Sequence, residues 1–274
     1  MKNRKILFHD QSMYSKNMGE NFHFQHALNF CQQIYSSNSI YTFIPKNLST
    51  TLRASTAIAN KYINNNKNEF IWTGYNNEFF KPSIKDLFNA NFTFVILRNP
   101  FLRLYSFYCN FISLYLHKKK ENEIIFNDLK KTLKKNLTEF SFCDFINFID
   151  GLFVHANSHW SPQKYFLIYE NYDLYIPFEK FNDYIDKIEL IAKIKLHDQR
   201  NFLDYSSDKF EKISNIFYGD TSGIEILKLI SSGKIPHFKC LYNDKLISLV
   251  SKIYHQDIEL YKNVFNIDAK DIFS

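Results

Sequence analysis

Two kinds of segment alternate along the first two thirds of the chain. Short runs of β-branched and aromatic residues, bounded by polar ones, are typical of buried strands, whereas stretches with apolar positions every three or four residues indicate amphipathic helices. The strand-like runs are residues 40–44, 69–73, 91–97 and 172–178. Strands that alternate with helices predict a central parallel sheet with crossover helices on its faces.

Helical patterns fill most of the remaining sequence. They cover residues 26–35, 52–63, 81–89, 101–117, 118–137, 141–149, 181–191 and 243–265. In 141–149, Ser141 and Asp144 have the spacing of a capping box. After residue 205 the pattern is helical throughout. We therefore expect an α/β fold, P-loop-like and three-layered, with a central parallel β-sheet flanked by helices and a helical C-terminal part.

Composition places the chain among folded globular proteins. It has 274 residues, of which 45% are hydrophobic, with only 6 Gly and 6 Pro. No linker is evident, so we expect a single domain over residues 1–274. The net charge of +6 suits an acidic ligand but is below that of a dedicated nucleic-acid binder, and no nucleic-acid partner is expected.

The spacing of the cysteines and the length of the apolar runs indicate the cellular compartment. The four cysteines form no CxxC pair and no zinc spacing, which favours reduced thiols in a reducing compartment. No apolar run is long enough for a signal peptide or a membrane span. We therefore expect a cytoplasmic location and no integral membrane segment.

A polar turn follows the first strand-like run and precedes a helix. Its residues are Lys46, Asn47, Leu48, Ser49, Thr50 and Thr51. The N–H groups of a first helical turn and the helix dipole favour an anion, to which Lys46 adds positive charge. The turn thus suits a phosphate or sulfate group, although an ordinary capped helix start gives the same pattern. It is not a Walker loop, because the required glycines are absent.

A second turn, residues 98–100, ends the strongest strand-like run. The following helix is apolar apart from one stripe at three- and four-residue spacing, formed by Arg103, Ser106, Asn110 and Ser113. A buried helix with a polar stripe needs water, polar side chains or a ligand against it. Because both turns follow strands, both are expected at the carboxyl edge of the sheet, where ligands bind in such folds.

These motifs resemble the carbohydrate sulfotransferases that use 3′-phosphoadenosine-5′-phosphosulfate (PAPS), above all the heparan 2-O and chondroitin/dermatan 4-O types, in a soluble bacterial-type form. Residues 44–52 resemble the 5′-phosphosulfate loop of that family. Residues 97–108 resemble its 3′-phosphate motif, with Arg98 and Ser106 eight residues apart and Asn99 where the family usually has Asp. Residues 159–163, His-Trp-Ser-Pro-Gln, resemble a His-Trp-x-Pro segment, and the similarity extends in order from residue 40 to about 260.

The resemblance implies transfer of a sulfuryl group from PAPS to a carbohydrate hydroxyl, with a surface or capsular polysaccharide as the expected acceptor and no metal. Lys46 and the 46–51 turn would hold the 5′-phosphosulfate and assist catalysis. Arg98 and Ser106 would hold the 3′-phosphate, with Arg103 nearby. The product would be 3′,5′-bisphosphoadenosine.

The catalytic base has two candidates, His159 from the His-Trp-x-Pro segment and Glu78 in the region before the third strand-like run. Two other functions stay open at this point. One is a different P-loop-like phosphotransferase or kinase. The other is an inactive glycan-binding protein with this fold, for which the basic residues of 118–137 would be the working surface, although a solvated charged face gives the same pattern.

Overall fold

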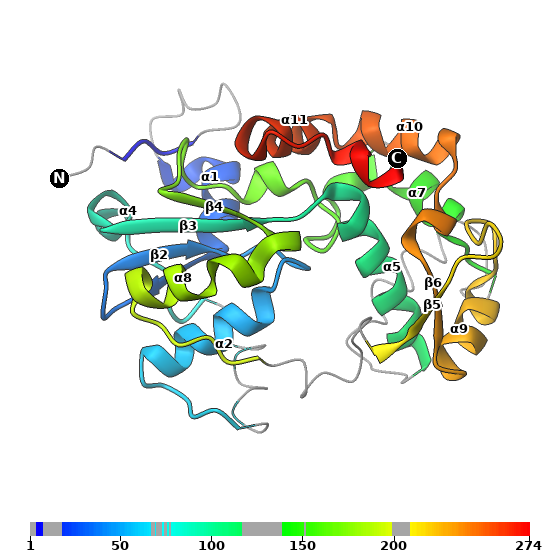
Figure 1. The fold of residues 1–274 in the computed structure, drawn as a ribbon. Coiled ribbons are helices and arrows are strands. Elements are labelled where there is room, and N and C mark those ends of the chain that lie inside the picture. The colour runs from blue at the N-terminus through cyan, green and yellow to red at the C-terminus, as the bar shows by residue number, and fades with distance from the viewer. Residues whose placement is uncertain are drawn as a thin grey trace. The chain divides into compact units, whose positions relative to one another are not determined.

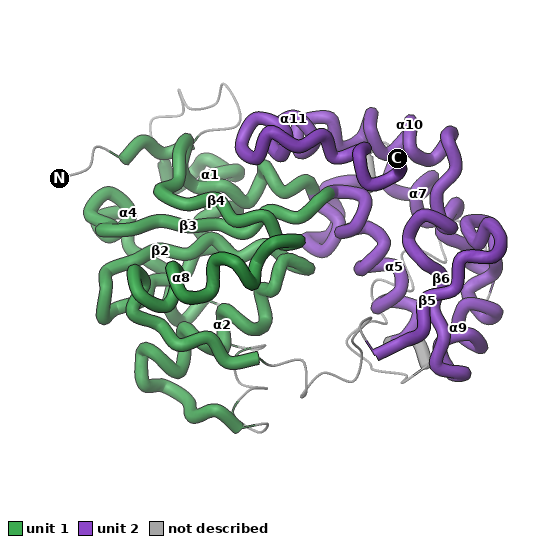
Figure 2. The backbone as a smooth tube through the Cα atoms, viewed as in Figure 1, with its two compact units in different colours: residues 1–99, 162–202 green, residues 100–161, 203–274 purple. Residues whose placement is uncertain are grey.

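The computed structural model describes residues 4–7, 18–66, 69, 73, 76, 78–116, 139–150, 152–198 and 209–274. The chain divides into two compact units, residues 1–99 with 162–202 and residues 100–161 with 203–274 (Figure 2). Each unit therefore combines two separate stretches of the sequence. The single domain expected for residues 1–274 stays a prediction.

The first unit contains a four-stranded sheet in the order β1-β2-β3-β4. Its strands are β1 (Cys31–Ile34), β2 (Ser39–Thr42), β3 (Phe92–Leu97) and β4 (Leu174–Pro177). β2, β3 and β4 are parallel, and β1 is antiparallel to β2. The expected α/β fold with a central parallel sheet is confirmed, and the carboxyl ends of its three parallel strands lie at one edge.

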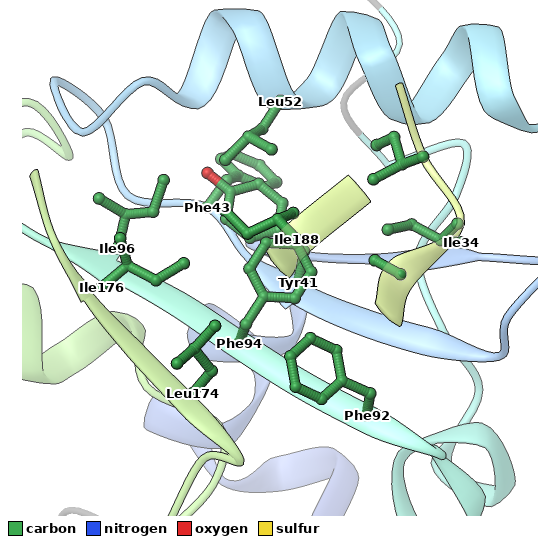
Figure 3. Packing of buried hydrophobic residues seen from close by; sticks show 12 residues of the cluster. Ile34, Tyr41, Phe43, Leu52, Phe92, Phe94, Ile96, Leu174, Ile176 and Ile188 are labelled. Carbon is green, nitrogen blue, oxygen red and sulfur yellow. The ribbon is translucent and has the colours of Figure 1, made fainter. Parts of the chain in front are cut away.

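Helices cover both faces of this sheet (Figure 1). The α-helices are α1 (Phe22–Asn29), α2 (Ser49–Ala59), α4 (Ile84–Asn89) and α8 (Ile185–Ala192), joined by the 3-10 helices η2 (Met18–Glu20), η5 (Gln163–Phe166) and η6 (Phe178–Tyr184). Leu52 of α2 and Ile188 of α8 join the core on one face, where Tyr41 and Phe94 stack (Figure 3). Phe30, after α1, packs against the same core and also contacts Phe166 of η5.

Three local predictions for this unit are wrong. The helix expected over residues 26–35 ends at Asn29, and β1 follows it. The two described residues of the strand expected over 69–73, Glu69 and Thr73, are both helical. Ile191, whose three-residue spacing from Ile188 in the helical pattern of residues 181–191 predicts an inward position, is 38% exposed, while the next residue, Ala192, is buried. In the first two cases a short apolar run fits both a helical and a strand period, and tertiary packing decides between them.

The second unit is mainly helical. Its α-helices are α5 (Pro100–Leu116), α7 (Phe142–Ile149), α9 (Gly223–Ser231), α10 (Asp244–Ile253) and α11 (His255–Phe265), with 3-10 helices η4 (Leu152–His155), η9 (Phe238–Leu241) and η10 (Ala269–Phe273). The predicted capping box of α7 is confirmed, because Ser141 and Asp144 bond to each other's backbone N–H groups. Aromatic side chains fill the core, with Trp160 only 2% exposed.

The C-terminal part differs from its prediction in two places. Strands β5 (Glu211–Ile213) and β6 (Lys234–Pro236) form a small parallel sheet with α9 between them in sequence, where only helix was expected. The helix expected over residues 243–265 breaks at Tyr254, whose hydroxyl donates to the carbonyl of Trp160 at 2.5 Å. The basic stretch 118–137 lies outside the described residues.

Candidate functional site

The turn between β2 and α2 leads into a helix whose first backbone N–H groups make no intrahelical hydrogen bond. The Leu52 N–H donates to the Leu48 carbonyl, so the N–H groups of the three preceding residues lie before the first intrahelical bond. Leu48 occupies the N-cap position and makes no side-chain capping bond. Lys46 (φ 73°) and Leu48 (φ 57°) both adopt the left-handed backbone region. Non-glycine residues in this region cost about 1 kcal/mol or more each, and such strain is concentrated at functional sites.

Asn47 anchors this turn to the neighbouring strand. Its side chain is fully buried, and its Nδ2 donates to the Ile96 carbonyl at 2.9 Å and to Gln163 Oε1 at 2.6 Å. Its Oδ1 is also buried and has no hydrogen-bond partner among the described residues. A buried acceptor of this kind is expected to bond to water or to a ligand. The turn is therefore held in place through the side chain of a residue that sequence reasoning placed in the site.

Arg98 follows β3 and lies against the same turn. Its Nη1 donates to the carbonyl of Lys46 at 2.9 Å, and its guanidinium stacks over the ring of Phe178 at 4.1 Å from the ring centre. Gln163 fixes the Arg98 backbone from both sides, because its Oε1 accepts from the Arg98 N–H at 2.9 Å and its Nε2 donates to the Arg98 carbonyl at 2.8 Å. The two predicted cationic residues are therefore joined at the carboxyl edge of the sheet.

The end of β4 is tied to the end of β3 as well. The Asn99 N–H donates to Oε1 of Glu179 at 3.0 Å. No sequence pattern predicted a role for Glu179 or Gln163, although Gln163 ends the His-Trp-Ser-Pro-Gln segment. Glu179 follows a predicted strand and Gln163 follows a proline, and neither position specifies a hydrogen-bond partner.

Arg103 and Ser106 lie on α5 in the second unit. Arg103 is 1% exposed and donates to the carbonyls of Ser161 at 2.7 Å and Ser158 at 3.0 Å. Burial lowers the pKa of its guanidinium, and the nearby Asp257 acts in the opposite direction. Neighbouring carbonyls thus supply polar partners to this part of the predicted stripe. Ser106 is half-buried on the same helix.

His159 lies in the loop that Arg103 holds. Both its backbone N–H and its Nδ1 are 2.9 Å from Oδ1 of Asn157. The amide oxygen can only accept, so this contact favours a proton on Nδ1 and, in the neutral ring, a lone pair on Nε2. That is the arrangement a general base requires. The ring of Phe107 packs nearby, with centroids 6.1 Å apart.

Glu78, the other candidate base, lies in an exposed turn of the first unit. The Phe80 carbonyl in this turn accepts from the N–H of Gln33 at 2.8 Å, and Gln33 pairs with Ile40 near the start of β2. The hydrogen bond holds the turn beside the amino ends of the parallel strands. Lys46 and Arg98 follow the opposite, carboxyl ends.

The described part of the chain contains no cluster of three or more histidine, cysteine or acidic side chains that could hold a metal ion. Within the same residues, no helix has both the length and the apolarity to cross a membrane.

The fold and the residues at the carboxyl edge of the sheet define a class of protein. It is an α/β protein with two anion-suited turns at the ends of neighbouring parallel strands. A family model described as "Sulfotransferase family" matches residues 14–265, which is most of the chain. The chain therefore belongs to the sulfotransferase family, and sulfuryl transfer is its general reaction. No curated protein and no solved structure gives a significant match.

Proposed function

We propose that the chain transfers a sulfuryl group from PAPS to a hydroxyl of a carbohydrate, with a surface or capsular polysaccharide as the expected acceptor. The observation that carries the donor assignment is the hydrogen bond from Arg98 to the Lys46 carbonyl, which brings two anion-suited groups together at the carboxyl edge of the sheet. PAPS carries a 5′-phosphosulfate and a 3′-phosphate, and two linked cationic groups match that pair of charges. The carbohydrate acceptor rests on the family resemblance of the motifs.

In this proposal the N–H groups and hydroxyls at the start of α2 bind the 5′-phosphosulfate, and the ammonium of Lys46 lies beside its bridging oxygen. Arg98 and Ser106 bind the 3′-phosphate. The planar, permanently charged guanidinium of Arg98 is the side-chain group best suited to pair with phosphate oxygens. The contacts of Arg103 support a positioning role for the loop that carries His159 rather than direct contact with the donor.

The transfer needs a base and a stabilised leaving group. The base takes the proton of the acceptor hydroxyl while its oxygen forms a bond to sulfur. The bond from sulfur to the bridging oxygen breaks, and its electron pair stays on the departing phosphate. Lys46 and the helix N–H groups stabilise this developing negative charge. Such electrostatic stabilisation of the transition state is usually the largest single contribution to catalysis. Of the two candidate bases, the contacts of His159 and the amino-end position of Glu78 favour His159.

Binding measurements with two nucleotides test the donor assignment. Titration calorimetry with 3′,5′-bisphosphoadenosine is expected to give a Kd in the micromolar range, or about −8 kcal/mol. ATP with Mg²⁺ should bind at least about tenfold more weakly, a difference of about 1.4 kcal/mol. Tight binding of ATP with Mg²⁺ and none of the bisphosphate would overturn the proposal in favour of a phosphotransferase. Bisphosphate binding without sulfation of any glycan in a pool of capsular and heparan-type acceptors would favour a binding protein.

A further inference from the structure

Gln163 occupies an unusual position in the first unit. Its side chain is 1% exposed and lies between two segments that are 65 and 116 residues away in the sequence. It bonds to the backbone of Arg98 twice and to the side chain of Asn47 once. It carries no charge and follows Pro162, so nothing in its residue type marks it as part of a site.

The direction of these hydrogen bonds follows from the backbone. The Ile96 carbonyl can only accept, so it must receive the Nδ2 group of Asn47. The N–H and carbonyl of Arg98 likewise require an oxygen and an amino group from Gln163. The Oε1 of Gln163 then receives both the Arg98 N–H and Asn47 Nδ2. Main-chain groups at both ends thus determine both amide orientations. A flip of the Asn47 amide would break two hydrogen bonds, and a flip of the Gln163 amide would break three.

We propose that Gln163 is a positioning residue that sets the spacing between the turn at residues 46–51 and Arg98, and thereby the protein's preference for nucleotides with two phosphate groups. The inference rests on the proposed function, because it takes the turn as the 5′ site and Arg98 as part of the 3′ site. A ligand with two linked anionic groups gains from binding both sites only when their separation matches its own. Among the residues that the structure describes, the side chain of Gln163 connects the two sites, because it bonds to both the Asn47 side chain and the Arg98 backbone.

A ratio of affinities tests this directly. The ratio is the Kd of adenosine 5′-phosphate divided by the Kd of 3′,5′-bisphosphoadenosine, both measured by calorimetry. Gln163→Met keeps the volume of the side chain but removes its hydrogen bonds to Asn47 and Arg98. The ratio is expected to fall by about tenfold or more, because the second phosphate no longer meets a correctly placed partner. The affinity for adenosine 5′-phosphate alone should change by less than about threefold.

Two further variants separate this role from a structural one. Asn60→Ala removes a buried amide that bonds to the Tyr35 N–H and the Gln33 carbonyl at the far end of α2. It should lower the melting temperature and leave the ratio unchanged. Asn47→Ala cuts the same connection from the other side and should lower the ratio, which keeps the proposal testable if Gln163→Met does not fold.

The outcomes distinguish failure of the proposed donor from failure of the positioning role of Gln163. If the wild-type protein shows no preference for the bisphosphate, the proposed donor fails and the role of Gln163 with it. If the wild type has the preference and folded Gln163→Met or Asn47→Ala retains it in full, the positioning role alone is overturned. A proportional loss for both nucleotides in the variants would show a merely structural residue.

Discussion

The guanidinium of Arg98 donates a 2.9 Å hydrogen bond to the carbonyl of Lys46, a residue 52 positions earlier in the chain. The bond connects the ends of two neighbouring parallel strands, β2 and β3. It also brings positive charge to the turn that precedes α2. Arg98 therefore has two possible contributions, one to the shape of the turn and one to ligand binding, and substitutions can separate them.

Replacement of Arg98 tests its ligand-binding role. Arg98→Ala is expected to weaken 3′,5′-bisphosphoadenosine binding by at least about tenfold, or about 1.4 kcal/mol, because it removes a charge that pairs with phosphate. Arg98→Lys keeps the charge but not the planar fork, so it should restore only part of the affinity. Calorimetry at matched ionic strength gives both values. Equal affinity of wild type and Arg98→Ala would remove Arg98 from the phosphate site.

Lys46 offers a way to separate backbone from side chain. Its φ of 73° favours glycine, so Lys46→Gly should unfold with a free energy about 1 kcal/mol higher than Lys46→Ala. Both variants lack the ammonium and should lose about 10²-fold or more in kcat, by the scale of lost electrostatic stabilisation. Urea titrations and sulfuryl-transfer assays supply the two numbers. Activity in Lys46→Gly would show that only the turn conformation matters.

The catalytic base is open to a three-variant comparison. His159→Ala should lower kcat by about 10²-fold or more while the affinity for 3′,5′-bisphosphoadenosine is kept. Asn157→Ala removes the acceptor at His159 Nδ1 and should lower kcat by a smaller factor. Glu78→Gln should leave the rate unchanged, because its turn lies beside the amino ends of the strands. A full rate in His159→Ala together with a loss in Glu78→Gln would reverse the assignment.

Arg4 provides a prediction about stability alone. It is 8% exposed and donates to the Ala90 carbonyl, Thr93 Oγ1 and, at 2.6 Å, Asp173 Oδ2. Arg4→Met leaves a largely buried carboxylate without its cation, which is expected to lower the free energy of unfolding by about 3 kcal/mol. The matched control is Lys234→Met, which breaks an exposed pair with Glu211 at 3.9 Å.

The control should cost less than about 1 kcal/mol, as exposed ion pairs usually do. Urea denaturation of both variants measures the difference. The partners of Arg4 lie just before or near the start of β3 and β4, at the end opposite the carboxyl edge. The affinity for 3′,5′-bisphosphoadenosine should therefore not change in folded Arg4→Met. Similar losses of stability in the two variants would contradict the prediction.

Alkaline pH should destabilise the protein through buried acids that cannot ionise. Burial raises the pKa of the Cys31 thiol from 9.0 to about 12, and it raises the pKa of Tyr172 in the same hydrogen-bonded group. Thr42 bonds to both side chains. Above pH 9 the unfolded chain loses the thiol proton while the folded chain keeps it. The folded state then binds more protons, and stability falls as pH rises.

The expected loss from Cys31 alone is about 1.4 kcal/mol for each pH unit between 9 and the folded pKa. Urea titrations at pH 7.5, 9 and 10 measure it. Cys31→Ala should show a shallower decline than wild type over the same range. An identical decline in the two proteins would assign the effect to the buried tyrosines instead.

Local chemistry was readable in the sequence wherever one residue type or one spacing suffices. β-branched and aromatic runs gave β2, β3 and β4, and the Ser141–Asp144 spacing gave the cap of α7. The turn at residues 46–51 and the position of Arg98 followed from strand ends and charge. The pattern did not reveal β1, β5 and β6, because each of these strands contains a single isoleucine and no run of β-branched and aromatic residues.

The sequence by itself indicated which residues are suited to an anion and that they would follow strands of a parallel sheet. Only the tertiary structure decided which residues hold them there: Gln163 meets Asn47 across 116 positions, and Arg103 meets the carbonyl of Ser161 across 58. An amide or a guanidinium has no periodic signature and can bond to any backbone group that the fold brings within 3 Å. Partners of this kind depend on the register of the strands and the path of the loops, which no local pattern specifies.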